Sequence, residues 1–220
     1  PDPQPGDRDH RTVRPAAADP AATNDPMRLF VALVPPVAVL ADLDRAVGPL
    51  RATRTDLRWS ARPDWHVTLA FLGEVAAPMA DRLAPELELA ARRHPPLSLA
   101  LSGAGAFPDP ARARVLWCGL DGDRPALAGL AASVAAGAGR AGVPPPDAGR
   151  PFRPHLTLAR SGRAPAGIRD LVAALTSYQG PRWRAERVEL IESHLGGQPR
   201  YTTIGGWPLG PGPDGDTLRP

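Results

Sequence analysis

Hydrophobic and polar positions follow two patterns along this chain, and these patterns divide it into strands and helices. Apolar residues at every second position in short runs are typical of strands, and apolar residues at every third or fourth position in longer runs are typical of amphipathic helices. Strands are predicted at residues 28–34, 57–59, 66–73, 97–101, 114–120, 155–160, 183–195 and 201–204. Helices are predicted at residues 37–51, 79–93, 125–141 and 168–176.

This order of strands and helices indicates an α+β fold in which antiparallel sheet is backed by helices. The glycine-rich residues 103–108 are predicted to form a loop. Residues 1–26 are rich in Pro, Asp and Ala and lack periodicity, which predicts a disordered tail. The expected organisation is therefore this tail, one ordered domain at 27–209 and a loose C-terminal tail at 210–220.

One short motif occurs on two of the predicted strands, as His66-Val67-Thr68-Leu69-Ala70 and as His155-Leu156-Thr157-Leu158-Ala159. Because side chains alternate across a strand, each histidine shares a face with its threonine, and the apolar residues face a core. By the same alternation, Ala70 is expected on the histidine face and Phe71 in the core. The repetition suggests two pseudo-symmetric lobes, each of which contributes one motif strand to a central cleft.

The amino-acid composition gives only a weak indication of the kind of molecule that the protein binds. All 26 basic residues are Arg, and the net charge of +3 becomes +5 without residues 1–26, which hold five Asp and three Arg. A mildly basic body favours an anionic partner such as nucleic acid, although biased genome composition also explains the Arg content. The single cysteine, Cys118, excludes an internal disulfide and a multi-cysteine metal site. The chain has no apolar stretch of membrane-spanning length and no signal-peptide pattern, so we expect a cytoplasmic protein without a membrane partner.

Two facing imidazoles are suited to acid and base chemistry. Histidine titrates near neutral pH, so one ring can accept a proton while its partner donates one. The hydroxyls of Thr68 and Thr157 can donate hydrogen bonds to the oxygens of a phosphate held between the rings. A metal site would require three or more converging ligands, and a covalent route would require an activated nucleophile; neither pattern occurs beside the motifs.

The paired motifs resemble those of the two-histidine phosphoesterases, and most closely those of the RNA 2′,3′-cyclic phosphodiesterases, also called 2′-5′ RNA ligases. The resemblance covers about residues 27–209. Besides the motifs, it rests on residues 28–33, 58–59, 103–108, 115–117, 151–160 and 192–193. It implies a fold of two pseudo-symmetric α+β lobes and metal-independent hydrolysis of an RNA 2′,3′-cyclic phosphate to a 2′-phosphate.

The resemblance also implies a role for each site residue. His66 would donate a proton to the departing 3′ oxygen, and His155 would be the proton acceptor that activates water. Thr68, Thr157 and Arg160 would bind the phosphate. Strict alternation places Arg160 on the opposite face from His155, so it reaches the cleft only if the strand ends or bulges there. No cofactor is expected, the expected partner is RNA with a 2′,3′-cyclic phosphate end, including tRNA fragments, and the protein is expected to be a monomer.

Two alternative functions stay open at the level of sequence. The same site could join tRNA halves reversibly through a 2′-5′ link, with an RNA 5′ hydroxyl in place of water. The basic body is also compatible with an RNA-binding module that has no catalytic activity. Phe107 and Trp65 could stack on a nucleobase, but packing within the protein is the favoured interpretation for both.

Overall fold

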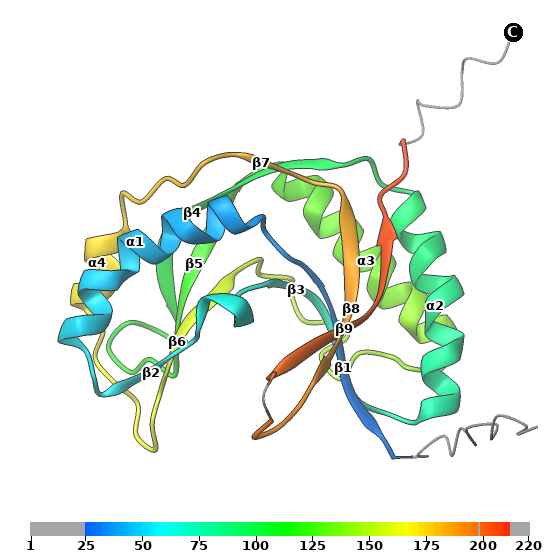
Figure 1. Cartoon of the computed structure of the whole chain (residues 1–220), viewed down its shortest axis with the longest axis horizontal. Helices are drawn as coiled ribbons and strands as arrows, with labels where there is room; N and C mark the ends of the chain where they lie inside the picture. Colours follow the sequence, from blue (N-terminus) through cyan, green and yellow to red (C-terminus); the bar gives the residue numbers. More distant parts are fainter. Residues whose placement is uncertain (1–24, 198, 212–220) are drawn as a thin grey trace, which may run out of the picture.

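The computed structural model describes residues 25–197 and 199–211, which form four α-helices and one nine-stranded sheet (Figure 1). The strands are β1 (Met27–Leu33), β2 (Leu57–Trp59), β3 (Val67–Val75), β4 (Leu97–Phe107), β5 (Val115–Gly122), β6 (Leu156–Ser161), β7 (Trp183–Ala185), β8 (Arg187–Ser193) and β9 (Tyr201–Pro208). The helices are α1 (Val37–Thr53), α2 (Ala77–Arg92), α3 (Arg124–Arg140) and α4 (Arg169–Leu175), and a short 3₁₀ helix, η1, spans Arg62–Asp64. The predicted α+β class is therefore confirmed.

The sheet consists of two halves that meet at one point. Its strand order is β7-β4-β5-β6-β3-β1-β8-β9, all neighbours are antiparallel, and β2 also pairs with β6. Most neighbouring strands share three or more paired positions, whereas β3 and β6 share the single pair Val67 and Leu156. The two halves therefore join beside the two histidines, because each histidine directly precedes one member of this pair.

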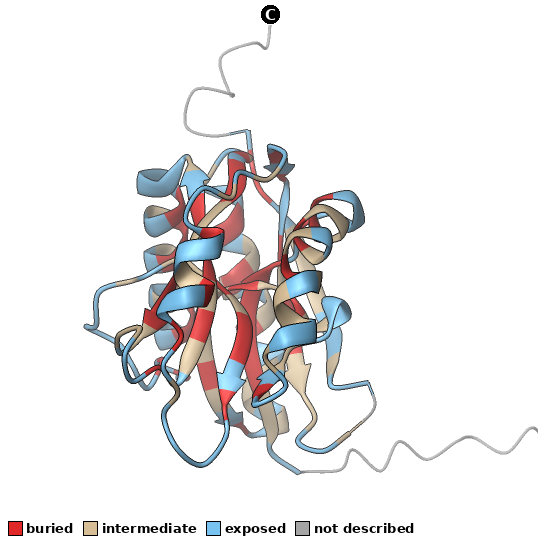
Figure 2. Cartoon of the chain, turned by 90° about the vertical axis from the view of Figure 1, so that its left-hand side faces the viewer, coloured by how far each residue is buried: buried red, intermediate tan, exposed pale blue. Residues whose placement is uncertain are grey.

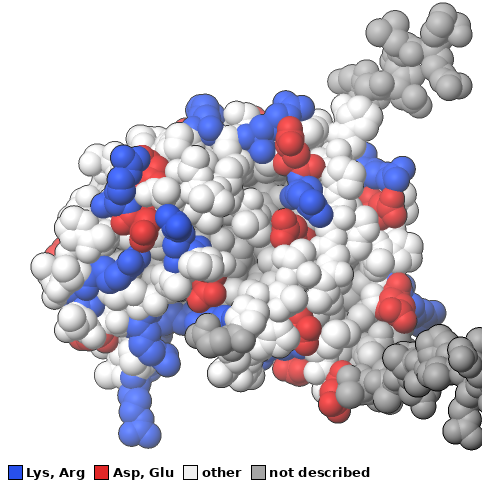
Figure 3. All heavy atoms as spheres, viewed as in Figure 1, with Lys and Arg blue, Asp and Glu red and all other residues white. Residues whose placement is uncertain are grey.

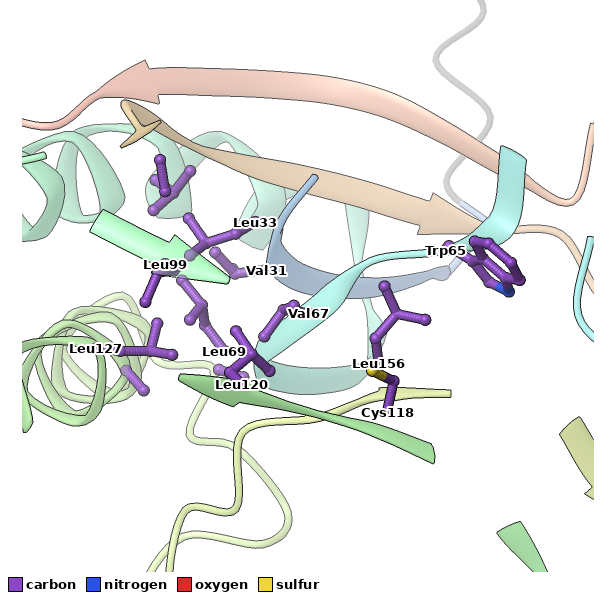
Figure 4. Packing of buried hydrophobic residues seen from close by; sticks show 14 of the residues in the cluster. Val31, Leu33, Trp65, Val67, Leu69, Leu99, Cys118, Leu120, Leu127 and Leu156 are labelled. Carbon is purple, nitrogen blue, oxygen red and sulfur yellow. The ribbon is translucent and has the colours of Figure 1, made fainter. Parts of the chain in front are cut away.

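The main hydrophobic core lies on one face of the sheet, beneath the helices. Leu29, Val31 and Leu33 of β1 belong to it, together with apolar side chains from all four helices. Figure 2 shows buried residues between the sheet and the helices, and Figure 4 shows Val67 and Leu156 close together within this core. The other face of the sheet carries a small apolar cluster around Phe30, and the motif histidines lie on that face.

The structure corrects three of the predicted element boundaries. Residues 103–107 continue β4 instead of forming a loop, because small side chains there accommodate the neighbouring strand; a Cβ on Gly105 would overlap the Trp117 ring. The predicted strand at 183–195 is two strands, and β7 pairs with β4 while β8 pairs with β1. β9 continues beyond residue 204, to Pro208.

The predicted tails lie almost wholly outside the described residues. Gly210, however, was assigned to the C-terminal tail and is buried; its N–H donates to the carbonyl oxygen of Ala91. Within the described ranges, no helix is both long enough and apolar enough to cross a membrane. Acidic and basic side chains are interspersed on the face shown in Figure 3. Some charged residues of the protein form ion pairs, such as Arg54 with Asp56.

Candidate active site

The two His-x-Thr motifs come together where the halves of the sheet join. Val67 pairs with Leu156 in an antiparallel register, which sets His66 opposite Thr157 and, by the same relation, the second histidine opposite the first threonine. Because side chains alternate, all four polar side chains project to the face opposite the core pair. The two motifs are therefore related by a local two-fold axis. Their two imidazoles and two hydroxyls lie around one point.

Both imidazole rings are held by the same local hydrogen bond. Nδ1 of His66 donates to the carbonyl oxygen of Asp64 at 2.8 Å, and Nδ1 of His155 donates to the carbonyl oxygen of Arg153 at 2.7 Å. A carbonyl oxygen can only accept, so the hydrogen of each neutral ring lies on Nδ1. Nε2 of each ring therefore carries the lone pair that can take a proton.

A β-bulge occurs at the same position in both motifs. The register of β3 against β1 skips Leu69, and the register of β6 against β5 skips Leu158. A bulge adds one residue to a strand and shifts the side chains that follow to the other face. The Leu and the Ala of each motif consequently both pack in the main core. The fifth residue after each histidine returns to the cleft face.

That fifth residue differs between the two motifs. Arg160 reaches the cleft by way of the bulge and lines the same cavity as both histidines. Phe71 was predicted to face the core, but it pairs with Phe30 in the apolar cluster of the cleft face. Ala70 was predicted to face the cleft, but it is buried in the main core. Both predictions were wrong because simple alternation does not allow for the bulge.

The predicted site residues line one small cavity of about 100 Å³. Since one water occupies about 30 Å³ of liquid, this cavity has room for a tetrahedral anion. All five predicted residues contribute to its wall. Sequence reasoning missed four others, namely Ser60, Asp64, Arg200 and Tyr201. None of the four belongs to a repeated motif, and Arg200 and Tyr201 reach the cavity only because β8 and β9 pair beyond β1.

His66 lies within a set of aromatic rings. Phe30 stacks on it with ring centroids 4.5 Å apart, and Tyr201 meets it edge-on at 5.2 Å. Burial disfavours the charged imidazolium and lowers the pKa of His66 to about 4. The Asp64 carbonyl opposes this shift, and the nearby positive groups reinforce it.

His155 has a different set of neighbours. Phe107 meets its ring edge-on at 4.9 Å, and the Trp117 ring is 6.3 Å away. Burial lowers the pKa of His155 as well, while the Arg153 carbonyl opposes the shift. Because both pKa values lie below 6.5, both rings are mainly neutral at pH 7.

A larger groove of about 1070 Å³ opens beside the cavity and shares Thr68, His155, Thr157 and Arg160 with it. Alanines of α3 form one of its walls. Its aromatic and basic lining residues are Phe71, Phe107, Phe152, Arg150, Arg153 and Arg160. Trp65, in contrast, is 1% exposed and belongs to the core, so it cannot stack on a ligand.

Other catalytic chemistries find little support at this site. Burial raises the pKa of the Cys118 thiol to about 12, so it is not a nucleophile at neutral pH. In the part of the chain that the structure describes, no group of three or more His, Cys, Asp or Glu residues is placed to hold a metal ion.

Comparison with known proteins agrees with this arrangement. The family described as the 2′-5′ RNA ligase superfamily matches residues 35–197. A Geobacillus stearothermophilus protein named RNA 2′,3′-cyclic phosphodiesterase is 34% identical over 72% of this chain and 50% of its own length. An Escherichia coli protein of the same name is 33% identical over 84% of this chain and 98% of its own length.

A solved structure shows the same fold. The crystal structure of E. coli LigT complexed with 3′-AMP has a TM-score of 0.63 and 29% sequence identity, covering 84% of this chain and 99% of that one. The chain spans about half the length of the Geobacillus protein but nearly the whole of the two E. coli chains. The family match, the identities and the shared fold together show that this chain belongs to the 2′-5′ RNA ligase superfamily.

Proposed function

We propose that this protein is an RNA 2′,3′-cyclic phosphodiesterase, which hydrolyses the cyclic phosphate at an RNA end to a 2′-phosphomonoester. The observation that carries the proposal is the shared cavity of about 100 Å³, whose wall includes the two motif imidazoles, the two motif threonines and Arg160. The names of the Geobacillus and E. coli relatives support it.

The proposed reaction is a single displacement at phosphorus. Nε2 of His155 takes a proton from water as the water oxygen forms a bond to phosphorus. The bond between phosphorus and the 3′ oxygen breaks, and Nε2 of His66 gives a proton to that oxygen. One water is consumed and both protons are accounted for, and each proton transfer typically contributes about 10²–10⁴-fold to the rate.

Three side chains hold the phosphate in this proposal. The hydroxyls of Thr68 and Thr157 donate hydrogen bonds to the non-bridging oxygens, and Arg160 supplies a positive charge. No step requires a metal ion, because these donors and the imidazolium offset the negative charge that develops on the phosphate.

The low pKa of His66 determines when it becomes a donor. Its ring is mainly neutral at pH 7 in the free protein, since burial lowers its pKa to about 4. A phosphate anion in the cavity favours the charged imidazolium and raises this pKa. We therefore propose that His66 acquires its proton together with the substrate.

The proposal extends to the rest of the RNA, the oligomeric state and the compartment. The large groove beside the cavity offers aromatic and basic side chains to the nucleoside and the RNA behind it. One chain supplies both histidines, so we propose that a monomer is active. We further propose tRNA fragments with cyclic phosphate ends as substrates and the cytoplasm as the compartment.

The direct test is product analysis. The protein is incubated with a nucleoside 2′,3′-cyclic phosphate in the presence of EDTA, and the monophosphate isomers are separated by chromatography. We expect the 2′-monophosphate alone. No turnover, or formation of the 3′-isomer, would contradict the proposal. A parallel reaction with added 5′-hydroxyl RNA shows whether this hydroxyl replaces water as the nucleophile.

A further inference from the structure

Arg200 lies beside the cavity, at the closed end of the hairpin formed by β8 and β9. The N–H of His194 donates to the carbonyl oxygen of Arg200 at 2.8 Å, and the next residue, Tyr201, pairs with Ser193. The Arg200 guanidinium lies 5.4 Å from the centre of the Tyr201 ring, within the range of a cation–π contact. The hairpin and the aromatic ring therefore position the Arg200 side chain next to the cavity.

Arg200 and Arg160 line the same cavity from opposite halves of the sheet. Arg160 belongs to β6, whereas Arg200 belongs to the hairpin that pairs with β1. Among the described residues, neither arginine has a carboxylate within 4.0 Å, whereas Arg54 and Arg187 do. Two cations that face one small cavity repel each other, so an anion between them stabilises the arrangement.

From this geometry we infer that Arg200 is a second phosphate-binding arginine, which contacts the same reactive phosphate as Arg160. The inference rests on the proposed function and adds a group to the site that neither motif contains. The cyclic phosphate carries one negative charge, and the charge on its oxygens grows during attack by water. A second guanidinium at the cavity consequently has its largest effect in the transition state.

A different role for Arg200 would give a different pattern of effects. Arg200 also lines a neighbouring cavity of about 510 Å³, together with Pro63 and His194. From there it could contact the next phosphate of a longer RNA. A nucleoside 2′,3′-cyclic phosphate has only the reactive phosphate, so it separates the two roles.

The test compares Arg200→Gln with Arg187→Gln on a nucleoside 2′,3′-cyclic phosphate. Arg187 is a matched control, because it lies at the other end of the same hairpin and pairs with Glu189. We expect kcat/KM to fall about 10- to 100-fold in Arg200→Gln, as for loss of a hydrogen bond between charged groups, and to stay within about twofold in Arg187→Gln. Arg200→Lys should recover part of the loss. An unchanged rate on the mononucleotide with a loss only on longer RNA would overturn the inference.

The pH profile supplies a second readout that a purely structural role would not move. The charged or titratable groups around His66 are Asp64, His155, Arg160, Arg200 and Tyr201. Removing the Arg200 charge removes one of the causes that lower the pKa of His66. The pH optimum of kcat/KM should therefore rise in Arg200→Gln and stay unchanged in Arg187→Gln.

Binding of inorganic phosphate separates failure of this inference from failure of the proposed function. Calorimetry at pH 7 on the full chain should show weaker phosphate binding in Arg200→Gln than in the original protein and in Arg187→Gln. If the protein has no phosphodiesterase activity but this difference holds, the phosphate site survives and the function is wrong. If phosphate binds equally to all three proteins, Arg200 is not part of the phosphate site.

Discussion

The two motif strands, β3 and β6, share a backbone geometry but differ in the side chains that surround it. Each strand holds its histidine through Nδ1 to a carbonyl two residues earlier, and each bulges after its threonine. The fifth residue after the histidine, in contrast, is Phe71 on β3 and Arg160 on β6. The backbone thus repeats the positions of the histidines and threonines, whereas the side chains around them differ between the two copies.

The surroundings of the two histidines also differ, because one ring is enclosed by aromatic side chains and the other lies beside an arginine. His66 packs against Phe30 and Tyr201 in an apolar cluster, and its pKa falls to about 4. His155 lies beside Arg160 and opens toward the large groove. In the proposed mechanism, this asymmetry distinguishes the ring that donates a proton from the ring that accepts one.

The largest expected effect comes from removing either ring. His66→Ala and His155→Ala should each lower kcat at least 100-fold, because each deletes one of two proton transfers. Steady-state kinetics on a cyclic nucleotide measures the loss, and thermal unfolding checks that both variants remain folded. Near-normal turnover by either variant would remove that histidine from the mechanism.

Substitutions of the residues five positions after the histidines should distinguish an effect of charge from an effect of packing. Arg160→Gln should lower kcat/KM about 10- to 100-fold, because a charged hydrogen bond to phosphate is lost. Phe71→Leu keeps an apolar side chain in its cluster and should change kcat less than about fivefold. Equal losses in the two variants would show that the two copies are not chemically distinct at this position.

Sequence reasoning predicted five residues that the structure places on one cavity, but it named a bulge only as a condition for Arg160 to reach that cavity. Periodicity predicted the motif strands correctly, because Val67 and Leu156, which follow the histidines, pack in the core as alternation requires. A bulge depends on the register against a neighbouring strand, which no local pattern encodes. Arg200 was missed for a related reason, because its place depends on pairing between strands far apart in the sequence.

A smaller effect is expected from the two threonines. Thr68→Val and Thr157→Val keep the shape of the side chain and delete one hydroxyl donor each. Each should lower kcat/KM about 5- to 20-fold, and the two losses should be similar because the two-fold relation places the hydroxyls equivalently. Steady-state measurement of kcat and KM for both variants checks this prediction. A loss confined to one variant would mean that only one threonine contacts the phosphate.

The smallest effect concerns the pH optimum. The proposed reaction needs His66 charged and His155 neutral, and burial lowers both pKa values, so the optimum of kcat/KM should lie below pH 6.5. Tyr201→Leu removes a ring that encloses His66, which should raise the pKa of His66 and move the optimum upward. Rates measured from pH 4 to pH 9 check both statements, and an optimum above pH 7 in the original protein would contradict the first.

The central claim is that both imidazoles act on one phosphorus as a single unit, and a double-mutant cycle tests it most directly. Groups that act together lose most of their joint contribution when either is removed. The kcat/KM of the His66→Ala, His155→Ala double variant should therefore lie within about tenfold of the slower single variant. A loss equal to the product of the two single losses would show that the histidines act independently and would contradict the account.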